Sequence, residues 1–125
     1  MSYYKIVSKL EDGSLVSLYL DSEEPCFRVY RKGKRGELHV VPSAMCFDSA
    51  EHAKEYAYPN KWRELWEIEG KYLGEPKTSL DAPDTKDLTE ERLLEIVLNA
   101  EEGCEAWFPQ GSIVLQNAKL VKKVA

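Results

Sequence analysis

The residues best suited to chemistry in this sequence are the cationic side chains between positions 28 and 39. That stretch holds five Arg and Lys side chains against one carboxylate, Glu37, which is a formal charge of +4. Cations beside an aromatic ring can bind phosphates and stack a base, as in proteins that bind nucleic acids. We therefore predict a site for nucleic acid or a nucleotide in residues 28–39. Its candidate binding residues are Arg28, Tyr30, Arg31, Lys32, Lys34, Arg35 and His39.

A second interpretation of this basic stretch is structural. Lysines on a solvated turn also keep a sheet edge from pairing with other chains. His39 precedes two valines and is equally consistent with a packing role. The whole chain has a net charge of −5, so the rest of its surface should repel a phosphate backbone.

A turn with two large aromatic side chains is the other candidate for binding. Trp107 and Phe108 precede Pro109, and such a turn either docks on a partner protein or folds back onto the core. The segment before it is acidic, because residues 81–105 hold nine carboxylates against Lys86 and Arg92. An acidic surface of this kind can imitate a phosphate backbone, and the alternative is a solvated helix face.

Motifs that indicate catalysis or metal binding are missing from the sequence. His39 and His52 do not form an HxxxH or HExxH pattern, and no phosphate loop, dinucleotide fingerprint or nucleophile elbow occurs. The three cysteines, Cys26, Cys46 and Cys104, are too far apart for a CxxC motif. We therefore predict no catalytic residue, no metal site and no cofactor, with the cysteines reduced and buried.

Length and composition predict one domain over residues 1–125. Hydrophobic residues make up 43% of the chain and charged residues 31%, which is typical of a folded domain with its own core. No apolar run approaches the roughly 18 residues that a membrane-spanning helix needs. We expect no contact with membranes and a location in the cytoplasm of a host cell.

Period-two patterns predict most of the sheet. Residues 3–10 and 14–20 flank the turn Glu11-Asp12-Gly13, which is a strong hairpin signal. Further strands are expected over 26–31, 37–41, 44–47, 62–69, 112–116 and 119–124.

Two helices should accompany these strands. Asp48 with Glu51 predicts a capping box for a helix that ends near Ala57. Thr89 is expected to cap a second helix that ends at Gly103. The fold class that follows is α+β, with a mixed, mostly antiparallel sheet and both helices packed against it.

Three stretches resemble a group of small α+β domains from phages and other mobile elements. They are Phe47-Asp48-Ser49, Leu65-Trp66-Glu67-Ile68-Glu69-Gly70 and Phe108-Pro109-Gln110-Gly111-Ser112-Ile113-Val114-Leu115. The resemblance covers about half the chain. In the order of its elements, this group resembles a trimmed ADP-ribosyltransferase.

That resemblance implies a set of residues that would orient the ribose of NAD. Arg28 or His39 would correspond to the transferase's early Arg or His, and Ser49 or Tyr56 to its Ser or Tyr. Gln116 stands where the late strand of a transferase has glutamate. We expect a non-enzymatic interaction protein of a virus or mobile element, which binds a host protein or, through residues 28–39, nucleic acid or a nucleotide. The alternative is a small NAD-dependent transferase.

Overall fold

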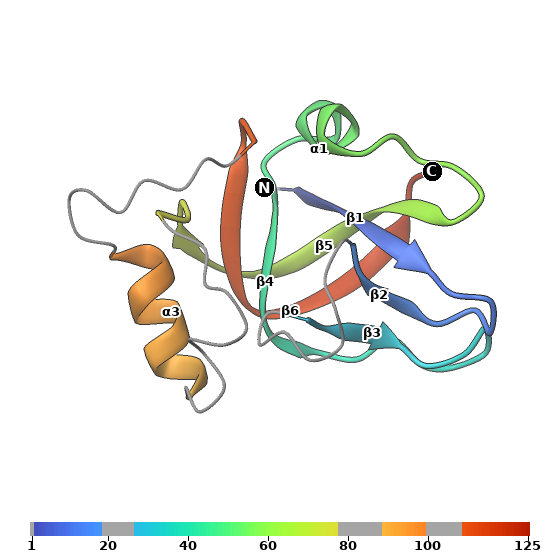
Figure 1. The fold of residues 1–125 in the computed structure, drawn as a ribbon, viewed down its shortest axis with the longest axis horizontal. Helices are drawn as coiled ribbons and strands as arrows, with labels where there is room; N and C mark the ends of the chain where they lie inside the picture. Colours follow the sequence, from blue (N-terminus) through green and yellow to red (C-terminus); the bar gives the residue numbers. More distant parts are fainter. Residues whose placement is uncertain (1, 19–26, 78–88, 100–108) are drawn as a thin grey trace.

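The computed structural model describes residues 2–18, 27–77, 89–99 and 109–125, which form six strands and two helices (Figure 1). The strands are β1 Tyr3–Lys9, β2 Leu15–Ser17, β3 Val29–Arg31, β4 Val41–Phe47, β5 Arg63–Gly74 and β6 Ser112–Lys123. The helices are α1 Ala50–Tyr56 and α3 Glu90–Leu98. A mostly antiparallel sheet with two short helices agrees in outline with the predicted α+β class. Neither described helix has the length and apolar character needed to cross a membrane.

The six strands form one sheet that closes on itself. Their order is β3-β2-β1-β4-β6-β5, and β1 also pairs with β5, so that β1, β4, β6 and β5 make a ring. One edge of β1 pairs with β5 from Tyr3 to Ser8, and the other edge pairs first with β4 at Tyr4 and then with β2. Every strand pair within the described residues is antiparallel, whereas the sequence predicted a mixed, mostly antiparallel sheet.

The inside of this ring is the larger core. Alternation along β1 directs Tyr3 and Val7 inward and Tyr4 and Ile6 outward, as the period of a strand requires. All six strands contribute buried side chains to the interior, which we call the inner core. Its members are Val7, Leu15, Tyr30, Val41, Ala44, Cys46, Trp66, Ile68, Ile113, Leu115, Ala118 and Leu120.

Helix α1 covers the outer face of β1, β4 and β5. Its Ala53 and the following Ala57 pack against Ile6, Phe47 and Leu65. The residue that caps this helix is Ser49, whose hydroxyl accepts a hydrogen bond from the backbone N–H of His52. The predicted cap was one residue too early, because Asp48 binds the His52 ring instead.

Helix α3 lies to one side of the sheet (Figure 1). Thr89 caps it as predicted and accepts a hydrogen bond from the N–H of Arg92. Val97 is buried, and its carbonyl accepts a hydrogen bond from the N–H of Lys77 just beyond β5. The described helix ends at Leu98, and the predicted end at Gly103 lies outside the described residues.

Strands β5 and β6 are longer than their local patterns predict. Gly70 was expected to end its strand, yet β5 continues to Gly74. A Cβ at Gly70 would lie 2.9 Å from the carbonyl oxygen of Gln116, so the glycine permits close contact with β6. The expected bend at Asn117 is a single residue with φ 51 inside a continuous strand. Pairing between the two strands therefore overrides both local signals.

Candidate functional site

The exposed part of the basic stretch is a loop of three cations after β3. Lys32, Lys34 and Arg35 are exposed, and none of them forms an ion pair with a described residue. The N–H of Gly33 donates to the Ser14 hydroxyl (2.8 Å), which fastens this loop to the β1–β2 turn. The loop therefore presents its charges from a fixed backbone.

Arg31 holds the same two turns together. Its Nε donates to the carbonyl oxygen of Gly33 (3.0 Å) and its Nη2 to that of Gly13 (3.0 Å). The guanidinium of Arg31 therefore stabilises the contact between the two turns. Arg31 also lines a hollow on the surface.

Tyr30 belongs to the inner core and not to the surface. Its side chain is 1% exposed, and the Lys5 ammonium lies 5.9 Å from the centre of its ring. Burial raises the pKa of the phenol far above its usual range. A base could not stack on this ring, so the prediction of Tyr30 as a binding residue is corrected. Alternation in a strand of three residues sends Val29 and Arg31 one way and Tyr30 the other.

Arg28 is also withdrawn from the surface, because three elements meet at its guanidinium. Nη2 donates to both carboxylate oxygens of Glu90 on α3 (3.0 and 2.8 Å), and Nε donates to the carbonyl oxygen of Ser43 on β4 (3.0 Å). The Ser43 hydroxyl donates to the same carboxylate. Arg28 therefore links α3 to the sheet, which corrects its assignment to an exposed binding loop.

A buried carboxylate that the sequence did not single out occupies one end of the strand ring. Glu64 accepts a hydrogen bond from Trp66 Nε1 (3.0 Å) and lies 3.3 Å from Lys123 Nζ and 3.7 Å from Lys9 Nζ. Desolvation raises the pKa of Glu64, but the Trp66 hydrogen bond and the two ammonium groups together hold it below its usual value. The alternating pattern of residues 62–69 predicted a strand. It could not show that the carboxylate of this strand would contact two lysines from other strands.

We expect Glu64 to make the stability of the fold depend on acid. A lowered pKa in the folded state means that the stabilisation is complete above the ordinary carboxyl pKa of about 4.3 and is lost as the pH falls through the folded-state value. Glu64→Gln should therefore lower the free energy of unfolding by about 2 kcal/mol at pH 7. Urea unfolding from pH 7 to pH 3 measures this difference, which should shrink below pH 4. A difference that stays constant over that range would contradict the assignment.

Trp62 is an exposed aromatic residue whose backbone contacts the end of β1. Its side chain is 48% exposed, and the Lys61 ammonium lies 5.2 Å from the centre of its ring. Its carbonyl accepts a hydrogen bond from the N–H of Lys9, where β1 runs into the turn that contacts Lys34. The β1–β2 turn thus joins this tryptophan to the basic loop.

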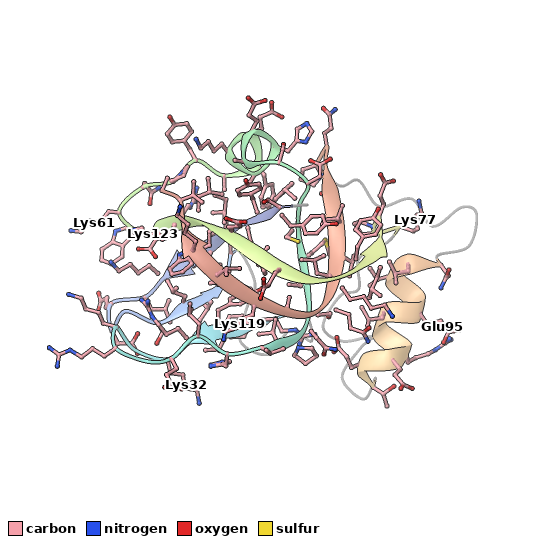
Figure 2. The ribbon with its side chains drawn as sticks, turned by 180° about the vertical axis from the view of Figure 1, so that it is seen from behind. Lys32, Lys61, Lys77, Glu95, Lys119 and Lys123 are labelled. Carbon is pink, nitrogen blue, oxygen red and sulfur yellow. The ribbon has the colours of Figure 1, made fainter. Side chains whose placement is uncertain are left out.

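We call this region the basic end. Lys32, Lys61 and Lys123 lie on the side of the molecule away from α3, which carries Glu95 (Figure 2). The sequence could not group these three lysines, because they come from three separate parts of the chain. The members of the basic end are Lys9, Lys32, Lys34, Arg35, Lys61, Trp62 and Lys123.

The other predicted binding residues fall elsewhere. His39 is exposed, and its N–H donates to the carbonyl oxygen of Tyr30. Trp107 and Phe108 lie outside the described residues. Cys46 is a free thiol in the inner core, where burial raises its pKa to about 12. That thiol is unsuited to nucleophilic attack, and Cys26 and Cys104 lie outside the described residues.

The second histidine, His52, forms a hydrogen bond with a residue four positions earlier in the chain. His52 Nδ1 lies 2.6 Å from Asp48 Oδ1, and this hydrogen bond raises the pKa of the imidazole. Gly111 sits against the pair, and a Cβ there would lie 2.4 Å from His52 Nδ1. Within the described residues, no three His, Cys, Asp or Glu side chains are grouped in a way that could hold a metal ion.

The residues that the transferase resemblance singles out are only partly brought together. Ser43 contacts Arg28 and is the cross-strand neighbour of Gln116, with Glu90 beside them. Ser49 caps α1, and the ring of Tyr56 packs 5.4 Å from that of Phe47. A scan of family models found no match to this chain, and neither a curated protein nor a solved structure matched it.

Proposed function

We propose that this protein is a non-enzymatic interaction protein that binds an anionic host macromolecule, with single-stranded nucleic acid as the ligand that best suits its basic end. The observation that carries the proposal is a half-exposed tryptophan, Trp62, in the same region as four cations, Lys32, Lys34, Arg35 and Lys61, that form no ion pair with a described residue. The sequence resemblance alone supports an origin in a virus or mobile element.

The charges of the basic end are available to a ligand. Lys32, Lys34, Arg35 and Lys61 form no ion pair with described residues. Glu64 lies within the same region, but two lysines and the Trp66 N–H already neutralise it. Six cations therefore outnumber Glu64 and the two exposed carboxylates of the β1–β2 turn, Glu11 and Asp12, at this end, whereas the net charge of −5 would repel phosphates from the remaining surface.

Trp62 favours a single strand over a duplex. An unpaired base can leave its neighbours and stack on an exposed indole, which contributes about 1–3 kcal/mol per base. A duplex offers its phosphates but keeps its bases stacked inside. The combination of a fixed basic loop and one open aromatic ring thus fits a short single-stranded segment.

The test is the affinity of fluorescent oligothymidylate, measured by anisotropy at two salt concentrations. Replacing Lys32, Lys34 and Arg35 together with Glu should weaken binding at least tenfold, because three phosphate contacts are lost. The salt dependence of the affinity should also fall, because fewer counterions are released on binding. The control carries Lys54→Glu, Lys71→Glu and Lys77→Glu, which change the net charge equally away from the basic end.

Trp62→Ala separates stacking from charge in the same assay. It should weaken binding about tenfold without changing the salt dependence, and Trp62→Phe should restore part of the affinity. Equal weakening in the two triple variants would indicate a nonspecific charge effect and overturn the site. No measurable binding by the wild type would overturn the function.

The second candidate function is a small NAD-dependent transferase. Its support is the meeting of Arg28, Ser43 and Glu90. These are the residue types of a transferase site, but Ser43 and Glu90 are not the positions that the resemblance singled out, which were Ser49 or Tyr56 and Gln116. Glu90 comes from a helix and not from a late strand, and its carboxylate is already bound by Arg28. Incubation with labelled NAD and a host lysate tests it, and absence of a labelled product would remove this candidate.

A further inference from the structure

The start of β6 is fastened to the segment that leads from β4 into α1. The pairing of β4 with β6 ends at Phe47 and Ser112. The next residue on each side continues it, because the N–H of Asp48 donates to the carbonyl oxygen of Gly111 (2.9 Å). The turn before β6 is also closed on itself, since the N–H and the hydroxyl of Ser112 both donate to the carbonyl oxygen of Pro109 (3.2 and 2.6 Å).

This turn, residues 109–111, which we call the β6 turn, rests directly on a pair of titratable side chains. Nδ1 of His52 lies 2.6 Å from Oδ1 of Asp48. A Cβ on Gly111 would overlap both of these atoms, so the glycine, which has φ 84, lets the backbone of the turn approach the pair closely. The position of the β6 turn therefore depends on the geometry of the contact between Asp48 and His52.

The charged groups that act on this imidazole are carboxylates. The hydrogen bond to Asp48 is the main cause of a raised pKa at His52, although partial burial acts against it. The negative charges of Asp48, Glu55 and Glu51 raise that pKa further. The β6 turn has no ionisable side chain, and the strands that pack under α1 contribute one titratable group, Tyr4, to the cluster there. The helix dipole disfavours a cation in the first turn of α1, so the carboxylates supply the stabilisation.

The raised pKa determines the pH range in which this contact is strong. The stabilisation by the His52 cation is complete below the ordinary imidazole pKa of about 6.5 and is lost as the pH rises through the folded-state value. A charge-assisted hydrogen bond to Asp48 is about twice as strong as a neutral one. Once the imidazole is neutral, the carboxylates of α1 also lose the cation that offsets their mutual repulsion.

We propose that the Asp48–His52 pair is a proton-operated latch, which holds the β6 turn against α1 in mildly acidic solution and loosens it in mildly alkaline solution. Its two states are the closed turn of the structure and a local opening in which the hydrogen bond between Asp48 and Gly111 is broken. Ser112 would open with the turn, because its N–H and hydroxyl are bonded to Pro109. The latch shares no residue with the basic end, so it does not depend on the proposed nucleic-acid function.

The test is amide hydrogen exchange of Asp48 and Ser112 at pH 5.5 and pH 8, corrected for the intrinsic exchange rate at each pH. In the wild type, the equilibrium constant for opening at both amides should rise about threefold between these pH values, whereas amides of β1 should change less. His52→Gln removes the titration but keeps a hydrogen-bond donor for Asp48, so its opening should not depend on pH. The matched control is Lys54→Gln, an exposed charge on α1 whose removal should leave the pH dependence intact.

Asp48→Asn separates the charge from the contact. It should lower the pKa of His52, followed by NMR titration of its ring protons, and reduce the pH dependence of opening at Ser112. Opening that is independent of pH in the wild type, or equally dependent on pH in His52→Gln, would overturn the latch. His52→Gln should leave the affinity for oligothymidylate unchanged, so failure here and failure of the oligonucleotide assay remain distinct.

Discussion

Arg28→Ala is expected to lower the free energy of unfolding by about 3 kcal/mol. The Arg28 side chain is 12% exposed, and its Nη2 donates to both carboxylate oxygens of Glu90, whose side chain is 32% exposed. Removing the guanidinium leaves a carboxylate and the Ser43 carbonyl without their charged donor, and breaking such a pair costs about 3–5 kcal/mol when both partners are buried. Because Glu90 is partly exposed, we expect the lower end of that range. Urea unfolding followed by tryptophan fluorescence measures the loss.

The matched control lies on the same helix. Arg92 and Glu95 also pair at 3.0 Å, but their side chains are 56% and 61% exposed, so Arg92→Ala should change stability by less than about 1 kcal/mol. Replacing Arg28 and Glu90 together with Met should cost less than Arg28→Ala, since no buried charge is left alone. Equal losses for Arg28→Ala and Arg92→Ala would show that the contact between α3 and the sheet does not contribute to folding.

Gly13→Ala is expected to destabilise the protein by about 3 kcal/mol and to separate the basic loop from the β1–β2 turn. Gly13 has φ 89, where a side chain costs about 1–2 kcal/mol. Its added Cβ would also lie 2.6 Å from Lys34 Cα, and backbone cannot move aside as a flexible side chain can. Thermal unfolding and hydrogen exchange at Gly33, whose N–H binds Ser14, measure the two effects.

Gly33→Ala isolates the conformational part of that cost. Gly33 has φ 71, but the nearest atom to its added Cβ is the Asp12 carbonyl oxygen at 3.9 Å. We expect a loss of about 1 kcal/mol from the backbone alone. If Gly13→Ala were no worse than Gly33→Ala, the close packing of the two turns would be refuted, and with it the fixed geometry of the basic loop.

The binding residues show where sequence reasoning succeeds and where it stops. The prediction that Lys32, Lys34 and Arg35 lie on an exposed loop is confirmed, because Gly33 and Gly36 interrupt this stretch and three cations within four residues cannot all be buried. Tyr30 was placed with them by proximity, but the pleat turns its ring inward. Trp62 was read as part of a strand pattern, and its exposure depends on where β5 begins. The Trp107 and Phe108 site stays a prediction.

Two local features were predicted correctly from the sequence alone. The Asp12-Gly13 hairpin and the Thr89 cap are confirmed, because each depends on hydrogen bonds between residues close in the chain. The closure of the ring, the Arg28–Glu90 pair and the basic end were decided by the tertiary structure. Arg28 and Glu90 are 62 positions apart, and Lys9, Glu64 and Lys123 come from three strands. Local patterns show which face of a strand is apolar, whereas only pairing and packing decide which distant charges meet there.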